Sequence, residues 1–287
     1  MLPAVHLKRN IDFNKGFKSL LEVLKLVAVA EYHNLEARFR TNDRLTTILG
    51  EFFDSVDLSV IEHPFLKPKG QPCVVAVTSD AGLLGGMNNN VVQKAIDIVR
   101  QCNGKLLVIG ERGLPYVQEA GLPFISYPGV IDSQRYNQAL EIRDYLLEKV
   151  LKNEYGPIHV VYPRAHSFTT HRTEAVTLIP FQAVQKDKQV MASKLKTRLS
   201  GSGVILESHP ADVAEYLVSV VFAQRLFDIF GYTRICEQAA RYLHLEESCN
   251  KIQEMNKKLY LQYFRRRHEV IDANMRDLFA SRALYAK

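Results

Sequence analysis

The chain has 287 residues, 47% of them hydrophobic, which allows one or two domains with a sizeable core. No apolar run is long enough to cross a membrane, so we expect no direct transmembrane span, and the first residues lack the apolar core of a signal peptide. The formal net charge of +6 is uneven: residues 1–40 carry seven Lys/Arg against four Asp/Glu, and residues 251–287 carry nine against four. These basic ends favour a partner with an acidic surface. Nucleic acid is not expected, because zinc-ligand spacing, helix-turn-helix patterns and interleaved aromatic and basic residues are all missing.

The first predicted element is a helix over residues 7–50, inside an N-terminal helical segment that we assign to residues 1–60. Apolar side chains recur along it at helical spacing, and lysines and arginines occupy the other side. The short run from Leu26 to Ala30 is apolar on every side. We therefore expect this run to be enclosed, either by the C-terminal helix or by a partner.

A proline-rich connector over residues 63–72 ends that segment, and a central domain follows that we assign to residues 70–206. In it, short β-branched runs alternate with amphipathic helical stretches. The predicted strands are 73–78, 105–110, 123–127, 157–162 and 176–180, and the predicted helices are one carrying Val91 to Val99, 114–120 and 133–152. This alternation predicts a Rossmann-like α/β domain with a mostly parallel sheet, in which 176–180 runs antiparallel. The polar stretch at about 181–203 is predicted to be a linker.

The last quarter, residues 209–287, predicts one long helix. Apolar residues recur every three or four positions at Leu245, Cys249, Ile252, Met255, Leu259 and Tyr263. This period is typical of a coiled-coil stripe. A helix of this length is much longer than a compact domain is wide, so another element must pack beside it. The N-terminal segment is the candidate. Gly231 interrupts the pattern and predicts a bend or break between two helical segments.

The loop Gly82–Asn90 follows a strand and precedes a helix, which is where backbone N–H groups can hold phosphate. Its glycine spacing fits neither nucleotide-binding fingerprint, so we interpret it as a structural turn, with Asn88 or Asn89 capping the next helix. Asp80 is either a catalytic carboxylate or, more often for such a position, a turn cap.

Two other groups of reactive side chains receive structural interpretations. His159, His166 and His171 lack carboxylate or thiolate neighbours at metal-ligand spacing, so we expect loop or surface histidines. The four cysteines are far apart and predict buried free thiols. The sequence thus gives no metal, cofactor or catalytic site.

Several motifs resemble one family. The run Thr78–Asn90 (TSDAGLLGGMNNN) resembles the stretch T-S-D-R-G-L-C-G-G-L-N-S-N in the gamma subunit of F-type ATP synthases. Further similarities follow in family order: Lys25–Ala30 to K-M-V-A-A-A, Ile109–Gly113 to I-G-R-K-G, Ser167–Phe168 and Leu178–Pro180 to F…L-L-P, Glu237–Arg241 to S-E-x-A-A-R-M, and Leu259–Arg267 to L-x-L-x-Y-N-R-x-R-Q.

This resemblance implies a non-catalytic rotor. Its terminal helices would form an antiparallel coiled coil inside a ring of alternating alpha and beta subunits. The α/β domain would lie outside the ring, near an epsilon- or delta-type stalk subunit and the membrane c-ring. Such a protein is peripheral to a membrane, at the bacterial cytoplasmic face of the inner membrane or, alternatively, on the matrix side of the mitochondrial inner membrane.

The resemblance also implies two sets of contact residues. Those expected to face the alpha/beta ring are Lys25, Val27, Ala28, Arg265, Arg267, Ile271, Asp272, Asn274 and Leu278. Those expected on the side of the stalk subunit or c-ring are Asp80, Gly82, Gly85, Gly86, Asn88, Glu237 and Arg241. Departures from the family pattern include Ala81 for its Arg, Tyr242 for its Met, and His268–Asn274 for its Q-A-x-I-T-x-E, so the chain reads as a divergent member.

Two alternatives stay open at this point. One is a stand-alone nucleotide-binding protein or enzyme that uses the loop Gly82–Asn90, and tight binding of ATP, NAD or phosphate by the isolated chain would favour it. The other is a gamma-like subunit of a specialised F-type-like ATPase with a different role.

Overall fold

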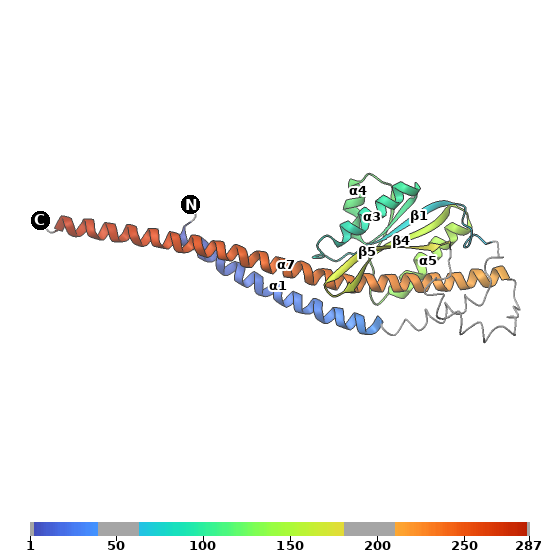
Figure 1. The fold of residues 1–287 in the computed structure, drawn as a ribbon, viewed down its shortest axis with the longest axis horizontal. Coiled ribbons are helices and arrows are strands. Elements are labelled where there is room, and N and C mark those ends of the chain that lie inside the picture. Colours follow the sequence, from blue (N-terminus) through green and yellow to red (C-terminus); the bar gives the residue numbers. More distant parts are fainter. Residues whose placement is uncertain (1–2, 40–62, 181–209, 286–287) are drawn as a thin grey trace, which may run out of the picture. The chain divides into compact units, whose positions relative to one another are not determined.

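The computed structural model describes residues 3–39, 63–180 and 210–285 (Figure 1). The chain divides into two compact units, one containing Glu31–Ala240 and the other Met1–Ala30 together with Arg241–Lys287. We call these the body and the helix pair. Two long helices, α1 (Ala4–Phe39) and α7 (Pro210–Tyr285), contribute to both units. The proposed domain boundaries at residue 60 and at 206–209, and the linker 181–203, fall outside the described residues and stay predictions.

The body is built on a five-stranded sheet of order β3-β2-β1-β4-β5. Its strands are β1 (Gln71–Val77), β2 (Lys105–Ile109), β3 (Phe124–Tyr127), β4 (Tyr155–Ser167) and β5 (Thr170–Ile179). The first four are parallel, and β5 pairs antiparallel with β4. The predicted mostly parallel Rossmann-like sheet is therefore confirmed, although β4 and β5 are longer than the predicted strands.

Helices cover both faces of this sheet (Figure 1). Alternate residues of β1 point to opposite faces, as the two-residue period of a strand requires. Val74 and Ala76 pack with α3 (Met87–Cys102) and α4 (Leu114–Glu119). Cys73, Val75 and Val77 pack with α5 (Arg135–Leu151) and with the first part of α7. The result is a three-layer body whose central strands are largely buried.

The first part of α7 belongs to the core of the body. Val218, Phe222, Leu226 and Phe230 are all buried and recur every four residues, so one face of the helix rests on the sheet. Pro210 occupies the first helical position, where its missing N–H leaves no bond unmade.

The break predicted at Gly231 is wrong, because α7 is one continuous helix of 76 residues. Gly231 is buried, directly after the fully buried Phe230. A glycine costs a helix interior only about 1 kcal/mol relative to alanine. The burial of the neighbouring apolar side chains outweighs that cost. Tertiary packing therefore keeps the helix continuous where the local pattern favours a bend.

The N-terminal helix is confirmed over α1, which begins at Ala4, three residues before the predicted start. It is described as far as Phe39, and the predicted continuation over residues 40–50 lies outside the described residues. Among the helices that the structure describes, none is both long and apolar enough to span a membrane.

Candidate functional site: the helix pair

Within the helix pair, α1 and α7 run antiparallel. Asn14 Nδ2 donates to Asn256 Oδ1 at 3.0 Å, and Lys18 Nζ donates to Gln253 Oε1 at 3.2 Å. Lys25 forms an ion pair with Glu246. Partners in α7 thus come earlier in the sequence as α1 proceeds. The predicted antiparallel pairing of the two terminal helices is confirmed.

The seam between these helices is narrow and apolar. Leu21 packs with Leu245, Cys249 and Ile252, and Leu24 adds to this cluster. These α7 residues are spaced by four and three positions, as in a coiled coil. The partner of Asn14, Asn256, is only 9% exposed. A polar pair in such a position fixes the register of two helices, because a slip would leave its amide groups unpaired.

The outer surface of the helix pair is also apolar. The large apolar side chains exposed there are Val5, Phe13, Phe17, Leu20, Val23, Leu26, Val27, Met255, Leu261, Phe264, Val270, Ile271, Met275, Leu278 and Phe279. Phe13 and Phe17 stack with ring centroids 6.2 Å apart. Exposed apolar side chains in this number on one unit are typical of a site of protein association.

The last turns of α7 carry the clearest part of this surface. From Phe264 to Ser281, every side chain except Arg266 is exposed. Leu261, Phe264, Ile271, Met275 and Leu278 recur at coiled-coil spacing and are 44–63% exposed. We call these five residues the outer stripe. It is a second apolar stripe on the same helix, and it has the pattern of a surface that a partner covers.

The residues expected to face a ring are distributed over this unit. Arg265, Arg267, Asp272 and Asn274 are exposed in the last part of α7, together with the two outer-stripe members Ile271 and Leu278.

On α1, Val27 is 53% exposed, whereas Ala28 is 1% exposed and offers no side-chain surface outward. The hydrogen bond from Lys25 to Glu246 raises the pKa of that lysine, so part of its charge is already engaged within the chain.

In the body, Asp80 is a turn-binding residue. Its Oδ1 accepts from the Glu111 N–H at 2.6 Å, and its Oδ2 accepts from the Gly129 N–H at 2.9 Å. Of the two interpretations of Asp80, the turn cap is the one that the geometry supports. The carboxylate joins the loops that follow β1, β2 and β3, at the edge where parallel strands end.

The other expected stalk-side residues differ in accessibility. Gly82, Gly85 and Gly86 are exposed. Asn88 is 8% exposed and sits inside α3, where its Oδ1 accepts from the Ser79 N–H at 3.2 Å. The predicted cap at Asn88 or Asn89 is therefore wrong, because Gly86 is the residue preceding α3 and the Asn88 amide is used by the preceding loop.

Glu237 and Arg241 lie on α7. Glu237 is 1% exposed and forms an ion pair with Arg234. Arg241 is half-buried. Of these two, only Arg241 has side-chain surface available to another chain.

The loop Gly82–Asn90 lies where Rossmann-like sheets bind nucleotides. The strand order reverses between β1 and β4, and ligands enter such sheets at that point, beyond the carboxyl ends of the strands. Here Leu84 and Met87 pack against Cys236 and Ala240 of α7. The helix thus covers the apolar side of this loop, and this packing supports the interpretation of the loop as a structural turn.

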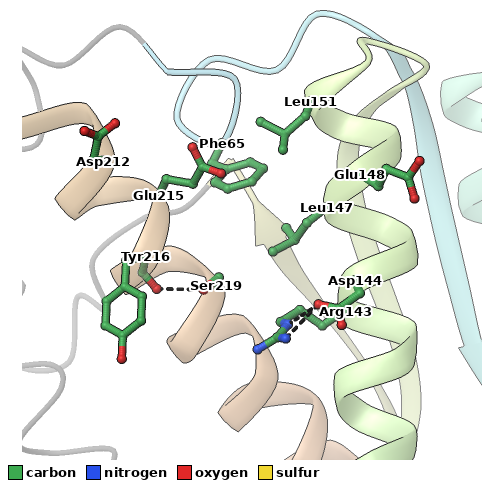
Figure 2. Close-up of a pocket in the computed structure, with 10 residues that line it drawn as sticks. All are labelled: Phe65, Arg143, Asp144, Leu147, Glu148, Leu151, Asp212, Glu215, Tyr216 and Ser219. Carbon is green, nitrogen blue, oxygen red and sulfur yellow. Dashed lines mark hydrogen bonds and ion pairs between the residues drawn. The ribbon is translucent and has the colours of Figure 1, made fainter.

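A cavity of about 580 Å³ lies elsewhere in the body, between α5 and the start of α7 (Figure 2). Its lining contains one guanidinium, that of Arg143, which pairs with Asp144. Its charged lining is otherwise acidic, from Asp144, Glu148, Asp212 and Glu215. An acidic lining repels phosphate, so this cavity does not provide a nucleotide site either.

The histidines and cysteines have structural surroundings. His159 Nδ1 lies 2.9 Å from Thr177 Oγ1, and His166 pairs with Glu174 at 3.1 Å. Within the described ranges, no group of His, Cys, Asp and Glu could hold a metal ion. All four cysteines are free thiols, three buried and Cys102 half-buried.

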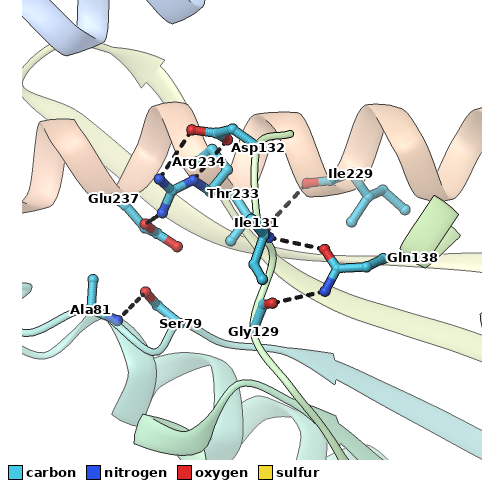
Figure 3. A network of polar contacts seen from close by, with 10 residues as sticks. All are labelled: Ser79, Ala81, Gly129, Ile131, Asp132, Gln138, Ile229, Thr233, Arg234 and Glu237. Atoms are coloured by element: carbon cyan, nitrogen blue, oxygen red, sulfur yellow. Dashed lines mark hydrogen bonds and ion pairs between the residues drawn. The ribbon is translucent and has the colours of Figure 1, made fainter. Parts of the chain in front are cut away.

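A polar network missed by the sequence analysis joins α7 to the body (Figure 3). Arg234 bonds Asp132 with two nitrogens, Nε to Oδ1 at 2.9 Å and Nη2 to Oδ2 at 3.1 Å, and bonds Glu237 with the third. Burial by itself lowers the pKa of Arg234, but Asp132 and Glu237 outweigh that effect and raise it. In the sequence, the signal for this network is an arginine on the buried side of an apolar helix.

Comparison with known proteins adds a family. A family model described as ATP synthase matches residues 5–283. The ATP synthase gamma chain of Chloroherpeton thalassium is 24% identical over 282 residues, covering 92% of each chain. That of Desulforamulus reducens is 24% identical over 289 residues and covers 99% of each chain.

Solved structures agree on the fold. A chain in the Euglena gracilis mitochondrial ATP synthase, from a structure of OSCP, F1 and c-ring, superposes with a TM-score of 0.72 at 16% identity, covering 98% of this chain and 93% of that one. A chain of the central stalk and c-ring of Tetrahymena thermophila mitochondrial ATP synthase gives 0.59 at 17% identity, covering 80% and 99%. Because the family model and these relatives span almost the whole chain, the protein belongs to the ATP synthase gamma-chain family, as a divergent member.

Proposed function

We propose that this chain is the central-stalk rotor subunit of an F-type ATP synthase or ATPase. In that role it couples rotation of a membrane c-ring to ATP synthesis or hydrolysis in a ring of alpha and beta subunits. It is a stalk subunit and not the catalytic one, so its task is mechanical. Its asymmetric surface forces the surrounding nucleotide sites into different states.

The exposed outer stripe of α7 carries this proposal most directly. The body buries its own apolar core, whereas the helix pair leaves many large apolar side chains exposed. The last part of α7 is also basic, with Arg265 and Arg267 exposed beside the stripe. A ring with an apolar inner surface and acidic loops complements the helix pair in both polarity and charge.

We assign ring contact to Lys25, Val27, Arg265, Arg267, Ile271, Asp272, Asn274 and Leu278. Ala28 belongs to the same proposed region, and its buried side chain would act by setting the shape of the helix pair. At the other end, Asp80, Gly82, Gly85, Gly86, Asn88, Glu237 and Arg241 mark the side facing an epsilon- or delta-type stalk subunit or the c-ring. In this group, the exposed glycines and Arg241 would touch a partner, whereas Asp80, Asn88 and Glu237 would shape the surface from within.

The chain would thus be peripheral to a membrane, held there by its partners. We propose the cytoplasmic face of a bacterial inner membrane, in keeping with the bacterial sources of the relatives. The matrix side of a mitochondrial inner membrane is the alternative. Fractionation of the native cells, with release of the chain together with the alpha and beta subunits, distinguishes the two.

Co-expression tests the assignment. We expect the full chain to co-purify with alpha- and beta-type subunits from the same organism, and the ATPase activity of the ring to depend on it. The variant Ile271→Asp places a charge in the outer stripe and should abolish co-purification, whereas Asp277→Asn, farther along the same exposed part of α7, should not. Isolation of the wild-type chain alone, with full ATPase activity in the remaining subunits, would refute the proposal.

A further inference from the structure

The first part of α7 is held in the body by contacts of two kinds. Phe222, Leu226 and Phe230 pack on the sheet and provide most of the buried apolar surface. Apolar burial is non-directional, so these contacts oppose a large rotation of the helix, which would expose its buried face, more strongly than a small one. A rotor that transmits torque needs that rotation fixed.

The triad of Asp132, Arg234 and Glu237 supplies a directional link, which we call the Arg234 tie. Arg234 and Glu237 belong to α7, and Asp132 belongs to the loop between β3 and α5 (Figure 3). The two bonds from Arg234 to Asp132, at 2.9 and 3.1 Å, form a planar fork. A bidentate pair is specific in angle as well as distance, so it resists both sliding and rotation. Glu237 holds the same guanidinium from its other side.

The loop that carries Asp132 is itself braced along the stretch just before that residue. The Gln138 side chain accepts from the Ile131 N–H at 2.9 Å and donates to the Gly129 carbonyl at 3.0 Å. Asp80 in turn binds the Gly129 N–H at 2.9 Å. A Cβ at position 129 would lie 2.5 Å from Asp80 Cγ, so only glycine permits this approach. A continuous polar path therefore joins the end of β1 to α7.

We propose that Arg234 is the positioning residue that locks α7 to the body against rotation, so that torque on the body passes into the helix without slippage. This inference rests on the proposed rotor function and identifies the residue through which torque passes from the loop between β3 and α5 to α7. It also gives Asp80 and Glu237 an internal role: the first braces the loop, and the second holds the arginine.

The experiment uses the assembled membrane complex and two variants. Arg234→Gln removes the whole tie. Asp132→Asn removes only the charge that crosses between elements and leaves the pair of Arg234 with Glu237, so it is the gentler change. For each complex we would measure the rate of ATP hydrolysis per assembled chain and the ions pumped per ATP hydrolysed.

We expect the number of ions pumped per ATP to fall about 2- to 30-fold in both variants, the range that mutations along a coupling path produce. Hydrolysis per assembled complex should stay close to that of the wild type. Arg234→Lys, which keeps the charge but not the fork, should restore part of the pumping. This split distinguishes positioning from folding, because loss of folded protein lowers both rates together and leaves their ratio unchanged.

Arg143→Gln is the matched control. The Arg143 side chain is 21% exposed, as is that of Arg234, but its partner Asp144 lies on the same helix. Its ratio of ions pumped to ATP hydrolysed should equal that of the wild type. An unchanged ratio in Asp132→Asn and Arg234→Gln overturns the inference while the rotor function stands. If the wild-type chain fails to assemble or couple, the proposed function falls and this inference falls with it.

Discussion

The two stretches of α7 share one helix and differ in what covers them. Between Pro210 and Ala240, a side of the helix rests on the sheet, and Leu226 and Phe230 are fully buried. Between Arg241 and Ser281, burial narrows to a single seam and then ends, so that Phe264 is 48% exposed and Leu278 is 63% exposed. Secondary structure alone does not distinguish the two stretches, because both are regular helix.

This difference shows which apolar side chains of α7 are buried by the chain itself and which are left exposed. In the body, apolar side chains on α7 find partners in the same chain. In the last part of α7, comparable side chains recur at similar spacing and stay about half exposed or more, and the ring contacts of Phe264 are with Tyr260 and Tyr263 on the same helix. Apolar surface at regular spacing that stays exposed is typical of an interface. The comparison therefore separates residues that stabilise the fold from residues that bind.

The largest expected effect comes from making the same substitution in both stretches. Phe230→Ala should lower the free energy of unfolding of the isolated chain by about 3–5 kcal/mol, because it removes a fully buried ring and leaves a cavity. Phe264→Ala should cost about 1 kcal/mol or less, since that ring is 48% exposed and its ring contacts, with Tyr260 and Tyr263, are on its own helix. Urea unfolding followed by circular dichroism measures both values. Equal destabilisation by the two variants would contradict the division of α7 into core and binding stretches.

A second pair of variants tests the seam inside the helix pair. Ile252→Asp puts a charge at a position that is 8% exposed and should destabilise the pairing by about 2–4 kcal/mol. Met255→Asp, at a position 52% exposed, should have little effect. Hydrogen exchange at the amides of residues 4–30 and 241–264 reports on the opening of the pair. Unchanged protection and helicity in Ile252→Asp would show that the seam is assigned to the wrong face.

Much of the fold could be predicted from the sequence because it depends on local periodicity. The predicted strand Cys73–Thr78 is a run of buried, mostly β-branched residues, and its pattern does not depend on what surrounds it. The coiled-coil stripe at Leu245, Cys249 and Ile252 is equally local. Gly231 shows the limit of this approach: helix propensity favours a break there, and only packing against the sheet keeps the helix continuous.

The site was less predictable because it depends on distant residues meeting. The side chain of Asn88 suits a helix cap, yet it accepts a hydrogen bond from the Ser79 N–H, nine positions earlier at the start of the preceding loop. Arg234 and Asp132 are 102 positions apart, and nothing in the local sequence of either residue indicates the other. Glu237 lies in a motif that resembles the family, but its burial becomes evident only when the helix is docked. Likewise, the exposure of the outer stripe is evident only once it is known where α1 begins beside α7.

The outer stripe predicts an effect on binding without an effect on folding. Leu278→Ala should weaken association with the alpha/beta ring by about 1–2 kcal/mol, or about 5- to 30-fold in Kd, because it removes a large apolar anchor. The unfolding of the isolated chain should not change. Asp277→Ala, on the neighbouring exposed position, is the control and should bind like the wild type. Titration of labelled chain into the purified ring measures the Kd, and equal affinity for both variants would place the ring contact elsewhere.

The two stretches should also differ in their response to alkaline pH. Burial raises the pKa of the Cys236 thiol to about 12, whereas an unfolded thiol ionises near its ordinary pKa of about 9. Between these values the folded state binds more protons than the unfolded state, so stability falls as pH rises. We expect Cys236 to account for a loss of about 1 kcal/mol between pH 8 and pH 10, absent in Cys236→Ala.

The seam offers a comparison for that measurement. Burial raises the pKa of Cys249 as well, but the nearby Lys25 opposes this effect. Cys249→Ala should therefore reduce the loss of stability between pH 8 and pH 10 by less than Cys236→Ala does. If Cys236→Ala retains the full loss of stability between pH 8 and pH 10, the thiol is not the group responsible.

The smallest effect concerns Lys25, which was assigned to the ring and also pairs with Glu246 in α7. The side chains of Lys25 and Glu246 are 24% and 40% exposed, so water screens their attraction, and Lys25→Met should destabilise the helix pair by no more than about 0.5 kcal/mol. A double-mutant cycle with Glu246→Gln isolates this pair, and its coupling should shrink in high salt. Binding to the ring then decides the role of the lysine. If Lys25→Met weakens binding while Glu246→Gln does not, Lys25 acts outward on a partner. If both variants weaken binding equally, the lysine acts only through the geometry of the helix pair, and the ring contact belongs to its neighbour Val27.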